Sequence, residues 1–304
     1  MDNTYTNLSA EQKTFYERAL LGRLVPSLVY CKYGQKKSAP KHEGDKVSFR
    51  RFNAISPKTT PLSEGVTPQS SALDITKVDA TVAQYGDFVR ITDKLDMLGI
   101  DPVLTETAQV LGESAALTLD TIARDVVNAG TNVQYAGAKS GRSALGAADK
   151  LTAEEVRKAV RTLRRNHAKP ADGKYYIGII DADAAFDLMS DPLWQDVSKY
   201  SGGTALMDGE LGKLHGVRFV ENGNPATFNG TSITVHSTLI LGKDAFGTVD
   251  IEGVGSVQNI VKPLGSAGTD DPLNQRASSG WKALFTAVRL QELAMLRIEH
   301  SVSA

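Results

Sequence analysis

The stretch DPVLTETAQVLGESAALTLDTIARDVVNAGTNVQYAG, residues 101–137, predicts a single helix of unusual length. Asp101 can cap its start, Pro102 suits the first helical position, and Gly130 can end it in a left-handed conformation. About 28 residues, from 102 to 129, at 1.5 Å per residue make a bar of about 42 Å. In a chain of 304 residues, a helix of that length must lie across other elements of the fold.

One face of this helix carries a continuous apolar stripe at alternating steps of three and four residues. The stripe predicts burial against a core, and Asp120, next to Leu119 in the chain, is predicted to be exposed. Val103, Val110 and Leu117 lie off the stripe, so a second face is open to being covered as well. The stripe consists of Leu104, Ala108, Leu111, Ala115, Leu119, Ile122 and Val126, and the predicted helix core is Leu104, Leu111, Leu119, Ile122 and Val126.

Two alternating segments before the helix predict a pair of strands. In KVSFRRF, Val47 and Phe49 point to one side, and VDATVAQYGDFVRIT, residues 78–92, alternates in the same way. The excursion between them is rich in Pro, Gly, Ser and Thr, with its tip at about residues 56–71. Such a hairpin arm has too little apolar surface to be stable alone and needs a neighbour. A disordered loop is the alternative.

The N-terminal region predicts a short helix and then an arm. Ser9 with Gln12 forms a possible capping box for a helix through about Leu21. Residues 22–45 contain scattered Pro, Gly and Lys, which indicates an extended arm rather than a packed element.

The second half of the chain predicts a mixture of helix and strand. Thr152 with Glu155 predicts a capped helix over 152–169, whose exposed face is basic. That face can meet phosphates, remain solvated, or form salt bridges to a neighbouring subunit. Short strands and a helix after Gly173 indicate an α/β subdomain, and the last segment predicts strands broken near Gln291, with a helix as the alternative. The basic residues are Arg157, Lys158, Arg161, Arg164 and Arg165.

Charge and cysteine content exclude several classes of protein. Lys plus Arg (34) nearly cancels Asp plus Glu (35), which argues against a DNA-binding protein but allows a neutral surface beside DNA. The single cysteine, Cys31, excludes a disulfide framework and a multi-cysteine metal site, so we expect it to be a small packing residue. The N-terminus shows no secretory signal, and no apolar run approaches the ~20 residues of a membrane span. We therefore expect a soluble protein made in the cytoplasm.

The sequence offers little that indicates chemistry. Asp181 and Asp183 follow a predicted strand, as do the carboxylates that hold a divalent metal in sugar-nucleotide transferases, but either residue can instead cap the next helix. No third acidic ligand, phosphate-binding loop or nucleophile motif accompanies them. The five histidines lack metal-ligand spacing. We expect no catalytic residue, no cofactor and no metal, and hence not an enzyme.

Three long stretches resemble one family. They are TPLSEGVTPQSSALDITKVDATVAQYGDFVRITDKLDMLGIDPVLTETAQVLGESAALTLDTIARDVVNAGTNVQYAG; YYIGIIDADAAFDLMSDPLWQD with HGVRFVENGN and TLILGKDAFGTVDIEG; and DPLNQRASSGWKALFTAVRLQELAMLRIEH. Together they are similar to the major capsid proteins of tailed bacteriophages, of a podovirus-type group with the HK97-like fold.

The resemblance implies an α+β fold made of an arm, an extended hairpin loop, a peripheral domain crossed by a long spine helix, and an α/β axial domain. The loop would lie over an adjacent subunit, with intersubunit contacts through Pro57, Lys58, Pro61, Leu62, Glu64, Val66 and Pro68. The implied segments are 1–45 (N-terminal helix and arm), 46–92 (hairpin and loop), 93–149 (peripheral domain with helix 102–129), 150–270 (axial domain) and 271–304 (strands returning to the peripheral domain).

The function that the resemblance implies is self-assembly into the icosahedral head of a phage enclosing double-stranded DNA. Expected partners are further copies in pentamers and hexamers, a portal protein at one vertex, scaffolding and decoration proteins, and packaged DNA bound non-specifically, with no membrane. The expected location is the virion, after synthesis in the host cytoplasm, without proteolytic maturation. The rival hypotheses are a metal-dependent transferase using Asp181 and Asp183, and an encapsulin-type compartment shell.

Overall fold

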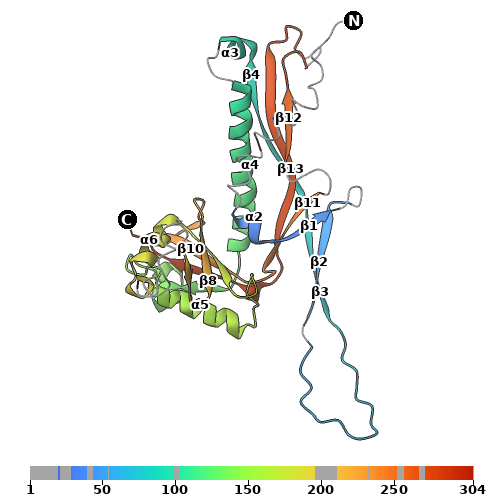
Figure 1. Ribbon diagram of the computed structural model, residues 1–304, viewed down its shortest axis with the longest axis vertical. Helices are drawn as coiled ribbons and strands as arrows, with labels where there is room; N and C mark the ends of the chain where they lie inside the picture. Colours follow the sequence, from blue (N-terminus) through green and yellow to red (C-terminus); the bar gives the residue numbers. More distant parts are fainter. Residues whose placement is uncertain are drawn as a thin grey trace.

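The computed structural model describes residues 20, 29–39, 44–53, 55–98, 103–195, 211–231, 233–251, 257–266 and 271–303. In these ranges a long helix stands beside an extended sheet, and a second sheet with two helices lies at the helix's C-terminal end (Figure 1). A hairpin with a long loop projects from the body. The mixture of helices and strands agrees with the predicted α+β class. None of the helices in the described part of the chain has the length and apolar character needed to cross a bilayer.

The long helix is α4, Val103–Asn128, a bar of 26 residues that agrees with the prediction within one residue at each end. It lies against β13, Arg276–Arg289, the long central strand of a five-stranded sheet. Alternate residues of β13 are buried in the same core as the helix, because successive side chains of a strand point to opposite faces. The sheet is completed by β1 (Gln35–Ala39), β4 (Ala83–Thr92), β11 (Phe246–Ile251) and β12 (Gln258–Lys262).

The buried stripe of α4 follows the prediction in the upper part of the helix and shifts below it. Leu111 and Leu119 are buried, whereas Ile122 and Val126 are only half-buried. The fully buried residues there are their neighbours Ala123 and Val127. The shift arises because the lower part of the helix is contacted from a second side, by residues 29–31 and 222–225. The side chain of Leu104 and the predicted caps Asp101 and Pro102 lie outside the described residues.

Gly130 follows the end of the helix, but not in the predicted conformation. Its φ angle is not positive, so the expected left-handed conformation is wrong. A Cβ at this position would lie 2.8 Å from Oε1 of Glu292 and 3.3 Å from the Val127 carbonyl oxygen, so a larger residue would require the Glu292 side chain to move. The glycine therefore permits a close approach between the end of α4 and the C-terminal segment.

The second sheet has seven strands in the order β5-β14-β10-β6-β8-β7, with β9 also paired to β10. Strand β6 is followed by helix α6, as predicted. Helix α5 lies below the strands of this sheet in the view of Figure 1. The helices are α5 (Ala153–Arg165) and α6 (Ala182–Ser190). The strands are β5 (Val133–Tyr135), β6 (Tyr176–Ile180), β7 (Lys213–Leu214), β8 (Val217–Glu221), β9 (Thr227–Asn229), β10 (Thr234–Leu241) and β14 (Met295–His300).

The predicted start of α5 is confirmed. The Thr152 side chain accepts the backbone N–H of Glu155 at 3.4 Å, one half of the capping box. Glu155 does not return the bond, because its carboxylate accepts from Gln134 at 2.6 Å and pairs with Lys158 at 2.9 Å. The helix ends at Arg165 rather than near residue 169.

Part of the predicted N-terminal arm is packed, which corrects the expectation of an extended segment. Residues Tyr30–Tyr33 form the short helix α2, with Tyr30 and Cys31 buried against α4. Strand β1 pairs in parallel with β11. The predicted helix from Ser9 lies outside the described residues apart from Leu20, which is buried.

The predicted second strand of the hairpin is two strands. Only β3, Ile75–Thr81, pairs with β2, Lys46–Phe52, and the chain then enters β4, which pairs with β13. The C-terminal strands break at the short 3-10 helix Glu292–Ala294, as predicted near Gln291. Sheet membership also divides the chain differently from the expected segments: β11 and β12 lie in the five-stranded sheet, and β14 lies in the seven-stranded sheet.

Candidate functional site

The most exposed feature of the molecule is the extended loop, residues 53–74, between β2 and β3. Figure 1 shows it standing clear of the body. All seven predicted contact residues, from Pro57 to Pro68, are exposed, including Leu62 (76 %) and Val66 (64 %). The backbone N–H of Val66 donates to the Ser63 carbonyl at 3.3 Å, which forms a turn at the tip. Two large apolar side chains therefore stand in solvent at the end of an arm.

The base of the hairpin is fixed to the body. Val47 and Phe49 are buried with Val249 of β11, which confirms the predicted inward side of the strand. Where the strands separate, Asn53 donates to Asp74 at 2.6 Å and to Thr76 at 2.9 Å. The loop thus has a rigid base and a tip that packs on nothing in its own subunit among the described residues.

A second uncovered surface lies along α4 and the preceding helix α3, Asp93–Leu98. Val110 and Leu117, both off the buried stripe, are 56 % and 55 % exposed. Met97 and Leu98 at the end of α3 are more exposed still. Neither surface presents a catalytic arrangement. Both present the apolar contact area from which subunit interfaces are built.

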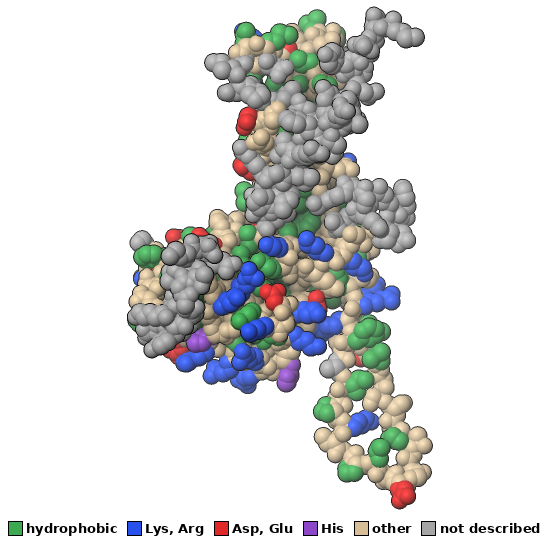
Figure 2. Space-filling view, viewed as in Figure 1, with side chains coloured by type: hydrophobic (Ala, Val, Ile, Leu, Met, Phe, Trp, Pro, Cys, Tyr) green, Lys and Arg blue, Asp and Glu red, His purple; other side chains and the backbone are tan. Residues whose placement is uncertain are grey.

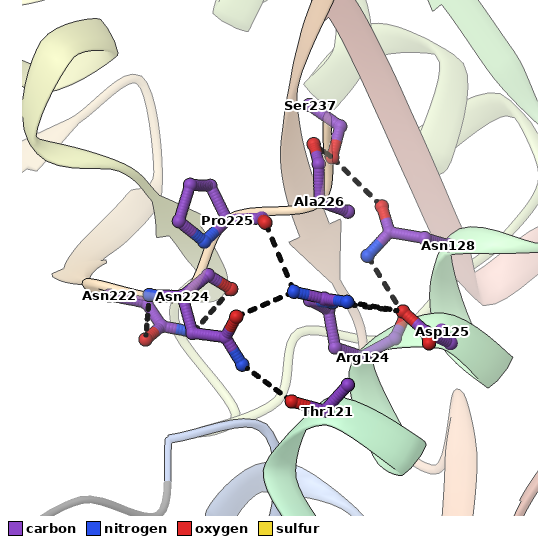
Figure 3. Close-up of polar contacts among 9 residues, drawn as sticks. All are labelled: Thr121, Arg124, Asp125, Asn128, Asn222, Asn224, Pro225, Ala226 and Ser237. Atoms are coloured by element: carbon purple, nitrogen blue, oxygen red, sulfur yellow. Dashed lines mark hydrogen bonds and ion pairs between the residues drawn. The ribbon is translucent and has the colours of Figure 1, made fainter. Parts of the chain in front are cut away.

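Polar contacts fasten the lower end of α4 to the seven-stranded sheet (Figure 3). The Arg124 guanidinium donates to Oδ1 of Asn224 at 2.5 Å and to the Pro225 carbonyl at 3.2 Å. Arg124 also pairs with Asp125 at 2.8 Å. The Asn224 amide in turn donates to Oγ1 of Thr121 at 2.9 Å. We call the contacts of Thr121 and Arg124 with Asn224 and Pro225, together with those of Asn128, the helix–loop latch.

Asn128 completes the latch one turn further along the helix. Its amide donates to the Arg124 carbonyl at 2.9 Å, and its Oδ1 accepts from the Ser237 hydroxyl at 2.9 Å. Ser237 belongs to β10, so the contact reaches the centre of the seven-stranded sheet. The latch therefore joins the C-terminal end of α4 to the seven-stranded sheet.

The structure corrects the prediction for Asp120. It is 1 % exposed and accepts backbone N–H groups of the α2 region. Burial raises the pKa of its carboxyl, and the backbone N–H donors oppose that shift only in part. Cys31, beside it, is a buried packing residue as predicted, and burial together with the charge of Asp120 raises the pKa of its thiol to about 12.

The structure also brings together residues that the sequence kept apart. Asp181 occupies the N-cap position of α6, but its side chain makes no capping hydrogen bond. Instead its Oδ2 lies 2.6 Å from Nδ1 of His236, 55 residues away, and Asp183 lies next to both. Nothing in the sequence pairs His236 with the aspartates, because the pairing depends on the register of β10 against β6.

The basic face of α5 is exposed as predicted. Figure 2 shows Lys and Arg side chains gathered over the lower part of the body, where α5 lies. Arg157, Arg161 and Arg165 are exposed, whereas Lys158 pairs with Glu154 at 3.3 Å and with Glu155.

Comparison with known proteins identifies the family. The family model described as phage capsid protein matches residues 75–298, most of the chain. The chain belongs to the phage capsid protein family. It is therefore a structural protein of a phage capsid.

Solved structures of phage capsids have a fold similar to that of this chain. The capsid protein is similar to the capsid of Ralstonia phage GP4, with a TM-score of 0.74 at 12% identity over 100% of this chain and 96% of that one. The capsid of cyanophage Pam1 gives 0.67 at 15% identity, over 100% and 97%. A virus-like particle from Pyrococcus furiosus gives 0.54 at 10% identity, over 95% and 100%. No curated protein matches the sequence. The predicted family and HK97-like fold are confirmed, and the transferase hypothesis is not favoured.

Proposed function

We propose that the extended loop is the clamp that joins neighbouring subunits of the shell. The observation that carries this proposal is the contrast between its two ends: Val47 and Phe49 are buried at the base, whereas Leu62 and Val66 near the tip are uncovered. When a second surface covers isolated apolar side chains on a projecting arm, the free energy falls because apolar area is removed from water. The contacts named from sequence, Pro57, Lys58, Pro61, Leu62, Glu64, Val66 and Pro68, are the proposed interface residues.

The rest of the subunit supplies the frame for these contacts. In this proposal the five-stranded sheet with α4 is the peripheral part, and the seven-stranded sheet with α5 and α6 is the axial part that clusters in pentamers and hexamers. The apolar side chains of α3 and α4, Met97, Leu98, Val110 and Leu117, receive a neighbouring copy. Many modest contacts of this kind, repeated in a closed shell, add up to a stable particle.

Further partners follow from the same role. A portal protein at one vertex, scaffolding or decoration proteins, and packaged double-stranded DNA are proposed partners, with synthesis in the host cytoplasm. The basic face of α5 is the described surface best suited to phosphate, because Arg157, Arg161 and Arg165 are exposed. The near balance of charges in the whole chain fits weak, non-specific contact with DNA.

Deletion of the loop tip tests the clamp. Residues Thr59–Gln69 are replaced by a short Gly-Ser turn, which leaves the base of the hairpin intact. The expected product is a folded, soluble subunit that forms no stable particles in electron microscopy or sedimentation. A matched control replaces Thr59, Thr60 and Ser63 by alanine and keeps Leu62 and Val66. Normal particles from the deletion variant would contradict the proposal.

A further inference from the structure

Three side chains with metal-ligating atoms converge where β6 ends beside β10. Asp181 stands at the N-cap of α6, Asp183 is in the first turn of α6, and His236 is on β10. One ligand atom from each side chain lies within 4.8 Å of the other two. Two carboxylates and one imidazole are a ligand set that suits a divalent transition metal.

Asp181 supplies a second and independent observation. An aspartate at an N-cap ordinarily accepts a backbone N–H of the helix, but this side chain accepts none. Its Oδ2 lies 2.6 Å from Nδ1 of His236, and its Oδ1 is buried without a hydrogen-bond partner among the described residues. The residue is 3 % exposed. A buried carboxylate oxygen without a partner costs free energy, and a bound cation would remove that cost.

We propose that Asp181, Asp183 and His236 bind one zinc-class divalent cation. Zinc accepts aspartate oxygens and histidine nitrogens, and three protein ligands leave its fourth position to water. Asp183 is exposed, so the ion has a route from solvent. The two carboxylates supply the negative charge that outweighs the positive N-terminal end of α6.

The consequence of binding is structural. The ion would tie the first turn of α6 to β10, which already pairs with β6, β9 and β14. Because an ion that binds only the folded state stabilises it by mass action, the seven-stranded sheet would resist unfolding more strongly when the site is loaded.

The test uses the full, untagged chain after treatment with a chelator. Zinc alone is titrated by isothermal calorimetry, and thermal unfolding is followed with and without zinc. The expected result is one zinc per chain and a higher Tm in its presence. Asp183→Asn should weaken binding at least tenfold and abolish the zinc-dependent rise in Tm.

The matched control is Glu154→Gln, because Glu154 is also an exposed acidic residue in the first turn of a helix. This variant should bind zinc as the wild type does. Absence of stoichiometric binding by the wild type, or equal affinity in Asp183→Asn, would overturn the proposal and leave Asp181 and His236 as an ion pair only.

Discussion

The carboxylate of Asp120 in α4 accepts a hydrogen bond from the backbone N–H of Val29 at 3.0 Å, across 91 residues of sequence. The same oxygen accepts the N–H of Cys31 at 3.3 Å. A single buried side chain thus satisfies two backbone donors at the start of α2 and holds residues 29–33 against the long helix. This segment leads into β1 and then into the hairpin. The two hydrogen bonds of Asp120, called the anchor below, therefore hold the part of the chain from which the hairpin starts.

Removal of this anchor should cost stability. Asp120→Ala leaves the N–H groups of Val29 and Cys31 without their acceptor in a buried place, which costs about 1–3 kcal/mol of unfolding free energy. Asp120→Asn keeps an oxygen in the same position and should stay within about 1 kcal/mol of the wild type. Urea denaturation of the three proteins measures the difference. If the alanine and asparagine variants were equally stable, the hydrogen bonds would not matter.

The same carboxyl gives an expected dependence on pH. Its pKa in the folded chain is raised above the ordinary value of 3.8 by burial. The folded state therefore binds the proton more readily than the unfolded state. The contribution of Asp120 to the unfolding free energy is fully present below the unfolded pKa, and it is lost as the pH rises through the raised pKa of the folded state. The unfolding free energy of the wild type relative to Asp120→Asn should fall over that range. A difference that is flat or rises with pH would contradict this prediction.

Substitutions two residues apart on α4 should have opposite outcomes. Leu119 is 1 % exposed, so Leu119→Asp buries an unpaired charge and should prevent folding. Leu117 is 55 % exposed, so Leu117→Asp should leave a folded, soluble subunit and weaken particle formation. Soluble yield and circular dichroism separate the first effect, and sedimentation of particles reports the second. Equal solubility of the two variants would mean that the buried face of the helix is misplaced.

Local sequence patterns made the elements of the fold predictable, but they did not make the long-range contacts predictable. The length of α4, the inward side of β2 and the strand break near Gln291 each depend on residues within one segment, and each was predicted. Asp120 was assigned to the solvent because its partners Val29 and Cys31 are backbone groups, which have no signature in the sequence. The pairing of Asp181 with His236 was missed for a similar reason: only strand register brings them together.

The phase of the lower half of α4 shows the same limit. A stripe read from spacing alone places Ile122 and Val126 on the buried side. Residues 29–31 and the loop 222–225 contact this part of the helix from another side, and burial moves to Ala123 and Val127. The contacting residues are far away in the chain, with Val29 91 residues before Asp120 and Asn224 103 residues after Thr121, so the helix's own sequence could not reveal them.

The latch leads to a prediction of its own. Arg124→Ala removes the donors to Asn224 and to the Pro225 carbonyl, so residues 222–226 should exchange their amide hydrogens faster. The expected cost in unfolding free energy is about 1–2 kcal/mol, because the guanidinium contacts are partly exposed to solvent. Asp125→Ala is the matched control, since its carboxylate pairs with Arg124 at the surface without contacting the loop. Equal exchange rates in both variants would show that the latch does not hold the loop.

The final prediction concerns the extended loop before and after assembly. Residues 56–71 are exposed throughout, and Pro57, Pro61 and Pro68 remove backbone donors that a regular strand pairing would use. In unassembled subunits we therefore expect rapid hydrogen exchange and early proteolytic cleavage in this segment. In particles, cover by a neighbouring copy should protect the same amides by at least tenfold, while exchange in β6 stays unchanged because that strand is buried in either state. Fast exchange of the loop in intact particles would mean that it lies free on the shell, and that subunits are held together by the surfaces of α3 and α4 instead.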